Sequence, residues 1–286
     1  MTEPRALTGL SQIADQYDAV LCDAWGVVHN GQRLYDGVGE ALTQFQATRG
    51  PVIILTNAPR LSDVIPAQLD SLGLSRDAYT RVVTSGDATR AAVTQRADSA
   101  FFKLGPSKDE TLFSALPISF VPLDEADVIV CTGLFNEMTE TPEDYRDMLK
   151  DAARRNIPMI CANPDKVVKL GDQLIYCAGA IADVYAELGG NVIYGGKPHA
   201  PIYELSRDVL RDKGLPADAR LLAIGDGVQT DILGANEQNI DVVFVAEGIF
   251  SEESRDDSGH LDTGKLAQLL KKHGVHAEYA MDGLVW

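Results

Sequence analysis

Short apolar runs, each bounded by turn residues, recur along this 286-residue chain and alternate with segments of helical periodicity. Strands that are apolar on both faces are typical of parallel sheets, because helices cover both sides of such sheets. The pattern therefore predicts an α/β fold with a doubly wound parallel sheet. The expected strands are Ala19–Cys22, Val52–Thr56, Arg81–Thr84, Val128–Cys131, Pro158–Ala162, Val192–Tyr194, Leu221–Ile224 and Val242–Val245.

Charge and cysteine content narrow the class of protein. Lysine and arginine number 25 and aspartate and glutamate 42, so the formal net charge is −17. A strongly acidic chain without a basic run is ill suited to bind nucleic acid or an anionic membrane. No stretch reaches the roughly 18 apolar residues of a membrane span, and Met1–Leu10 shows no secretory signal pattern. The four cysteines lack the spacing of a metal site, so we expect reduced thiols and a cytoplasmic location.

Polar residues follow several of the expected strands. Asp23 ends the first, Thr56 and Asn57 end the second, Lys197 comes shortly after Val192–Tyr194, and Asp226 follows Leu221–Ile224. In open α/β sheets ligands bind at the carboxyl ends of strands, so we expect one composite site. The segment 85–191 has strands and helices of its own but fewer such endings. It is predicted to be an inserted α/β domain, with the core formed by residues 1–84 and 192–286.

These residue types suit phosphate and metal chemistry. A carboxylate such as Asp23 at a strand end can act as a nucleophile or bind a metal, although it can also cap a turn. Asp226 and Asp231 offer hard oxygen ligands for Mg²⁺, and Asp231 alternatively caps the following helix. Thr56 and Asn57 offer donors for phosphate oxygens. Lys197 can balance an anion, or be a solvated loop lysine.

The motifs together resemble a known superfamily. D-x-W-G-V-x-x-x-G, L-T-N-x-P-R, A-N-P-D, G-G-K-P and G-D-x-x-x-T-D-I occur in this order between Tyr17 and Gly248. They resemble the motifs of the haloacid-dehalogenase-like (HAD) superfamily, and more closely those of its subfamily IIA, the NagD-like phosphatases. The resemblance implies a Rossmann-like HAD core with an inserted α/β cap domain. It also implies a hydrolase that cleaves a small phosphate monoester, such as a sugar phosphate or similar metabolite.

The resemblance assigns roles to individual residues. It implies that Asp23 attacks phosphorus and forms an aspartyl-phosphate, while Thr56 binds the phosphate and Lys197 balances its charge. Mg²⁺ would be held by Asp23, the backbone carbonyl of Trp25 and Asp226, with Asp231 as an outer or second acidic position. Substrate-side positions that match are Asn57, Arg60, Asn163 and Asp165, although N-P-D is also a common turn. Caps of this type form dimer surfaces in some members of the family, so the resemblance also allows a homodimer.

One position departs from the family pattern. Most HAD phosphatases carry a second aspartate two residues after the nucleophile as general acid and base, whereas this chain has Trp25. An indole N–H only donates and cannot serve as a base. Another group such as His29 can supply the proton, although a loop histidine bonded to backbone is the simpler interpretation. Alternatively the leaving group needs little help, or the chain is a weakly active or non-catalytic phospholigand-binding protein.

Overall fold

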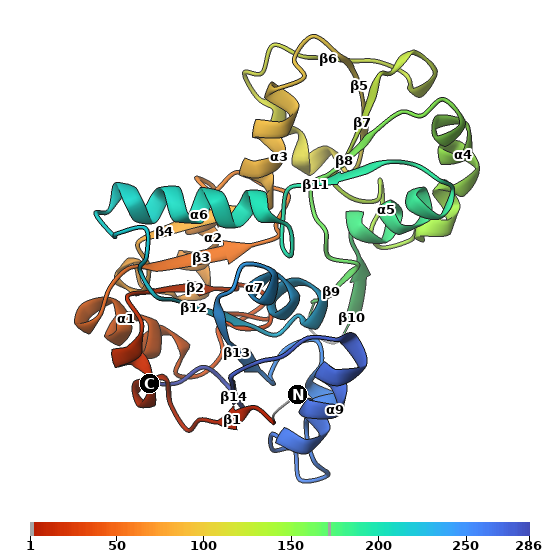
Figure 1. Cartoon of the computed structure of the whole chain (residues 1–286). Helices are drawn as coiled ribbons and strands as arrows, with labels where there is room; N and C mark the ends of the chain where they lie inside the picture. Colours follow the sequence, from red (N-terminus) through yellow and green to blue (C-terminus); the bar gives the residue numbers. More distant parts are fainter. Residues whose placement is uncertain (1–2, 171–172) are drawn as a thin grey trace.

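The computed structural model describes residues 3–170 and 173–286. Two α/β domains lie next to each other, each built on its own sheet (Figure 1). The core sheet has seven parallel strands in the order β1-β14-β13-β12-β2-β3-β4. Their bounds are β1 Arg5–Ala6, β2 Ala19–Cys22, β3 Val52–Thr56, β4 Arg81–Thr84, β12 Leu221–Gly225, β13 Asp241–Val245 and β14 Tyr279–Met281.

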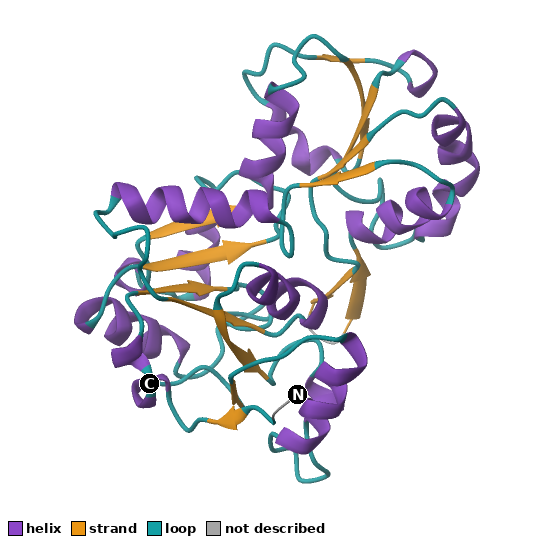
Figure 2. Cartoon of the chain, viewed as in Figure 1, coloured by secondary structure: helices purple, strands orange, loops and turns teal. Residues whose placement is uncertain are grey.

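Helices cover both faces of the core sheet (Figure 2). Side chains alternate along β3, so that Val52 and Ile54 join one apolar cluster while Ile53 and Leu55 join another. The first cluster takes in α1 Val38–Thr48 and α2 Ile65–Leu72. The second takes in α6 Ala200–Asp212, α7 Leu233–Glu237 and α9 Thr263–His273. A strand buried on both sides explains why these segments are apolar throughout.

The inserted domain has a second parallel sheet, in the order β11-β8-β7-β5-β6. Its strands are β5 Ala100–Leu104, β6 Ser119–Phe120, β7 Val128–Cys131, β8 Met159–Cys161 and β11 Val192–Tyr194, and its helices are α3 Ser85–Thr94, α4 Arg146–Arg154 and α5 Ala178–Glu187. An antiparallel hairpin, β9 Val167–Leu170 and β10 Gln173–Tyr176, extends from this domain beside the core (Figure 1). We call the whole insertion the cap.

Short elements complete the chain. The helix α8 spans Ser251–Ser254, and the segment Val228–Ile232 forms a wide π-type turn before α7. Short 3₁₀ helices occur at Leu10–Gln12, Ala14–Gln16, Arg76–Ala78, Ser107–Phe113, Leu123–Glu125 and Pro142–Tyr145.

The fold class expected from the sequence is confirmed. All eight predicted strands are present, with ends that differ by at most one residue. The predicted domain boundary needs one correction: the sequence pattern predicts Val192–Tyr194 in the core, but β11 pairs with β8 of the cap. The core therefore resumes at Gly195. The strand pattern alone could not show this, because an apolar run carries no information about which sheet it joins.

Two other expectations concern cysteines and membranes. All four cysteines are buried free thiols. None of the helices formed by residues 3–170 and 173–286 combines the length and apolar character that crossing a membrane requires.

We expect the core to fold without the cap. Two apolar clusters belong to the core sheet and two others to the cap sheet, so neither core depends on the other. The two ends of the insertion lie close together, since a Cβ at Gly196 would be 2.6 Å from Oγ of Ser85. Replacing Ser85–Tyr194 with a short Gly/Ser linker should therefore leave a cooperative thermal transition, measured by circular dichroism beside the intact chain. A product without such a transition would show that the core needs the cap.

Candidate active site

The site lies where the core sheet changes its winding direction. β2 and β12 are parallel neighbours, yet the chain leaves β2 toward α1 on one face and leaves β12 toward α7 on the other. Such a switch point opens a crevice at the carboxyl ends of the two strands. Asp23 directly follows β2 and Asp226 directly follows β12, so both carboxylates enter this crevice.

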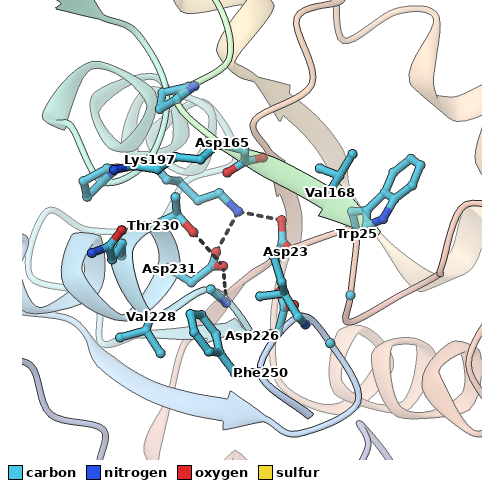
Figure 3. A pocket seen from close by; sticks show the side chains of 18 of the residues that line it. Asp23, Trp25, Asp165, Val168, Lys197, Asp226, Val228, Thr230, Asp231 and Phe250 are labelled. Carbon is cyan, nitrogen blue, oxygen red and sulfur yellow. Dashed lines mark hydrogen bonds and ion pairs between the residues drawn. The ribbon is translucent and has the colours of Figure 1, made fainter. Parts of the chain in front are cut away.

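A buried lysine joins two of the acidic residues. Nζ of Lys197 lies 2.5 Å from Oδ1 of Asp23 and 2.6 Å from Oδ1 of Asp231 (Figure 3). Lys197 is 2% exposed, and Asp23 and Asp231 are 7% and 6% exposed. A buried ammonium is stable only when paired, so Lys197 is a structural requirement of this acidic centre rather than a solvated loop lysine.

The pKa values follow from burial and from this pairing. Burial raises the pKa of the Asp23 carboxyl, and Lys197 opposes part of that effect. Burial alone would lower the pKa of Lys197, but the Asp23 and Asp231 carboxylates outweigh it and raise that pKa above its usual value. Lys197 therefore stays charged at neutral pH and favours the ionised form of Asp23, the form that a nucleophile needs.

Asp226 is surrounded by backbone. Its Oδ2 accepts a hydrogen bond of 2.7 Å from the N–H of Ile249. Gly26, at φ +89°, and Gly248 pass so close that a Cβ at either would lie within 2.5 Å of the Asp226 carboxylate. Burial and the neighbouring Asp231 raise the pKa of Asp226 to about 7. The high pKa indicates that this carboxylate lacks enough positive charge within the protein itself.

The acidic cluster fits a divalent cation. Asp23, Asp226 and Asp231 each offer an oxygen atom, and these atoms lie within 4.8 Å of one another. When all three are ionised, Lys197 offsets one negative charge and two remain. Carboxylate oxygens are hard ligands, and Mg²⁺ binds through one or two of them together with water and substrate oxygens. Both charge and ligand type therefore fit a divalent metal ion.

Asn57 holds the lysine loop and the cap together. Its Oδ1 accepts from the backbone N–H of Lys197 at 2.8 Å, and its Nδ2 donates to the backbone oxygen of the same residue at 3.1 Å. The same Nδ2 donates to Oδ1 of Asp165 in the cap at 2.9 Å. Burial raises the pKa of Asp165, which lines the site cavity beside Lys197. Asn57 thus positions Lys197 instead of facing the cavity itself.

The other predicted residues divide into two groups. Thr56 lines the cavity, and its Oγ1 accepts from the N–H of Ala58 at 3.2 Å. Arg60 donates to Oε1 of Gln68 at 2.7 Å, and Oδ1 of Asn163 accepts from the N–H of Asp165 at 3.0 Å. Neither Arg60 nor Asn163 lines the cavity, so their binding of substrate stays a prediction. Asp231 does not cap a helix: α7 begins at Leu233, and Oδ2 of Asp231 accepts from Gly227 N–H.

The side chains of Trp25 and His29 lie next to each other, and only Trp25 reaches the cavity. Trp25 lines the cavity, and its ring meets the His29 ring edge-on with centroids 5.2 Å apart. Nδ1 of His29 accepts a 3.0 Å hydrogen bond from Gly31 N–H. Burial lowers the pKa of His29 to about 4, so it is neutral at pH 7. This geometry matches the loop-histidine interpretation and leaves His29 a poor proton donor near neutral pH.

Several cavity residues were not singled out from the sequence. They include Val168, Tyr194, His199, Glu247 and Phe250. Glu247 and Phe250 follow β13, a strand that the sequence did predict, so the rule for strand ends would have located them. Val168 lies on β9, whose proximity to the core is a tertiary feature that no local pattern carries.

The low pKa of His29 predicts a pH dependence of stability. An unfolded histidine titrates near pH 6.5. Between about pH 6.5 and 4 the unfolded chain then binds more protons than the native chain, so the free energy of unfolding falls as the pH falls. The contribution should reach about 3 kcal/mol. Urea unfolding at pH 7 and pH 4.5 should show it, and His29→Asn, which keeps an acceptor near Nδ1, should lose this part of the pH dependence. If the free energy of unfolding fell equally in both proteins between pH 7 and pH 4.5, His29 would have an ordinary pKa.

Comparisons with known proteins identify the family and the fold of the chain. No curated protein matches the chain. A family profile described as haloacid dehalogenase-like hydrolase matches residues 20–118, and a HAD-hydrolase-like profile matches residues 194–270. A solved hydrolase of the haloacid dehalogenase-like family from Brucella suis 1330 is 39% identical, with a TM-score of 0.85 and coverage of 100% of both chains.

Two more distant solved structures share the fold. One is a possible sugar phosphatase of the HAD superfamily from Cytophaga hutchinsonii, 22% identical over 99% of each chain, with a TM-score of 0.80. The other is glycerol phosphate phosphatase from Mycobacterium tuberculosis in complex with magnesium, 22% identical over 89% of this chain and 77% of that one, with a TM-score of 0.63. The Brucella relative, matched along its whole length, shows that this chain belongs to the haloacid dehalogenase-like family of hydrolases.

Proposed function

We propose that this protein is a Mg²⁺-dependent phosphatase of the NagD-like subfamily that hydrolyses a small phosphorylated metabolite through an aspartyl-phosphate on Asp23. The observation that carries the proposal is the buried Lys197 ammonium, shared by Asp23 and Asp231 within the acidic cluster that includes Asp226. Phosphoryl transfer depends mainly on positioning and on neutralising charge, and this centre offers both. The glycerol phosphate phosphatase and the possible sugar phosphatase share the fold, which supports the same class of reaction.

The chemistry begins at the carboxylate of Asp23. Lys197 holds its Oδ1 and so restricts its rotation. A carboxylate oxygen forms a bond to phosphorus while the bond from phosphorus to the ester oxygen breaks, and the alcohol leaves with the bonding electrons and takes up a proton. Water then attacks the aspartyl-phosphate, which releases inorganic phosphate and restores the carboxylate.

Other residues would bind the charges of the phosphoryl group. Asp23 and Asp226 would hold Mg²⁺, with the Trp25 backbone carbonyl and Asp231 as the further groups, and the bound ion supplies positive charge opposite the phosphoryl oxygens. The Thr56 hydroxyl would donate to one of these oxygens, since it lines the same cavity. The Asn57 amide fixes the position of the Lys197 loop through two hydrogen bonds to its backbone.

A second candidate function is phospholigand binding without turnover. Trp25 favours it, because it occupies the position where most relatives have a second aspartate, and His29 is neutral and bonded as an acceptor. Release of inorganic phosphate from a panel of esters, with and without Mg²⁺, distinguishes the two functions. Tight binding of an ester with no release at any Mg²⁺ concentration would favour the binding protein.

Asp23→Asn should abolish turnover. The amide is nearly isosteric with the carboxylate but is a much poorer nucleophile, so p-nitrophenyl phosphate hydrolysis should fall at least about 10³-fold. The exposed Asp77, on a surface turn, offers a matched control, and Asp77→Asn should keep full activity. A thermal melt of each variant checks folding. Activity of folded Asp23→Asn within tenfold of the parent would remove Asp23 as the nucleophile.

Asp226→Asn should weaken Mg²⁺ binding at least about tenfold, because the amide lacks the negative charge that attracts the ion. Calorimetric titration of Mg²⁺ into both proteins at pH 8, where Asp226 with its pKa of about 7 is mostly ionised, measures the difference. Asp77→Asn again serves as the control. Equal dissociation constants for the parent and Asp226→Asn would place the ion elsewhere.

A further inference from the structure

The cavity that contains Asp23 extends well beyond the catalytic groups. Its volume is about 660 Å³, within the range of sites that enclose whole small molecules. A phosphoryl group fills only a small part of this space. The remainder is available to the group that leaves during hydrolysis, so the walls there determine which esters bind.

Those walls come from both domains and mix apolar side chains with polar ones such as Asn30, Gln229, Thr230 and His273. The cap supplies Val168 from β9 and Tyr194 from β11, while the core supplies Val228 after β12, Phe250 after β13 and Val275 after α9. Figure 3 shows Trp25 and Val168 on one side of the Lys197–Asp23–Asp231 network, and Val228 and Phe250 on the other. Apolar side chains therefore flank the reacting centre on two sides.

The described lysines and arginines of these walls offer no unpaired cation outside the acidic centre. Apart from Lys197, the only described lysine lining the cavity is Lys166, whose Nζ is paired with Oδ2 of Asp183 at 2.6 Å, and no described lining residue is an arginine. His199 is stacked on Tyr194 with centroids 4.6 Å apart, and burial lowers its pKa, so it is neutral at pH 7.

Two carboxyl groups add negative charge to walls whose described residues include no unpaired lysine or arginine. Asp165 and Glu247 both line the cavity, and Oε2 of Glu247 is buried without a hydrogen-bond partner in the structure. A carboxylate or second phosphate on the leaving group would therefore lose its hydration against apolar walls and face like charges. Burial of an uncompensated charge carries a large free-energy cost.

We propose that this cavity selects phosphate monoesters whose leaving group carries no negative charge of its own, a neutral alcohol in place of a hydroxy acid or a second phosphate ester. This inference rests on the proposed phosphatase function. It concerns only the part of the cavity outside the acidic centre, so the proposed function and this inference can fail separately.

Two matched pairs of esters test the inference. Phenyl phosphate and 4-carboxyphenyl phosphate differ by one carboxylate, and glucose 6-phosphate and 6-phosphogluconate likewise differ mainly by the carboxylate of the second. We expect kcat/KM, measured by release of inorganic phosphate, to be at least about tenfold higher for the first member of each pair. Equal or reversed values in either pair would overturn the inference. No release from any of the four esters would instead contradict the proposed function.

Variants of Val168 test whether the leaving group contacts this part of the wall. Val168→Lys places a cation on the wall and should bring kcat/KM for 4-carboxyphenyl phosphate toward that for phenyl phosphate, a change of about tenfold in their ratio. Val168→Met is the matched control, with similar length but no charge, and should leave the ratio as in the parent. An unchanged ratio in Val168→Lys, with the variant folded and active on phenyl phosphate, would show that the leaving group does not contact this wall.

Discussion

The buried ammonium of Lys197 is the contact on which the arrangement of the site depends. It joins Asp23, 174 positions earlier in the chain, to Asp231, 34 positions later. Without it three carboxylates would share a crevice from which water is largely excluded, and their mutual repulsion would be uncompensated. The strand order of the core sheet puts β2 next to β12, and the lysine makes that order compatible with so many buried acids.

The same lysine couples the centre to the cap. Its backbone is held on both sides by the Asn57 amide, which also donates to Asp165 of the cap. One amide side chain therefore sets the loop that carries the ammonium and contacts the domain that covers the cavity. A displacement of the cap that breaks the Asn57–Asp165 bond would leave a polar pair partly unsatisfied at this junction, which favours the docked position seen here.

The sequence could predict the core and the acidic centre because both depend on local patterns. Apolar strands are recognisable one at a time, and the rule that ligands bind at strand ends then brings Asp23, Thr56 and Asp226 together. Lys197 follows β11, a strand of the cap sheet, so this rule does not explain its place in the site, which the family resemblance predicts. The sheet membership of β11 and the position of the β9–β10 hairpin could not be predicted from local patterns. Both depend on packing between segments distant in sequence. Arg60 is a different case, because its partner Gln68 lies only eight residues further along the chain and Arg60 bonds to it instead of lining the cavity.

Trp25 and the apolar side chains beside the reacting centre have a common chemical consequence. With an indole in place of the usual second carboxylate and a neutral His29 beside it, the described residues near Asp23 offer little help in protonating a departing alcohol. An ester whose leaving group departs readily as an anion needs least help, and aryl alcohols ionise far more easily than sugar hydroxyls. Aryl groups also gain most from burial against Val168, Val228 and Phe250. The substitution at position 25 and the walls of the cavity thus favour the same class of substrate for independent physical reasons.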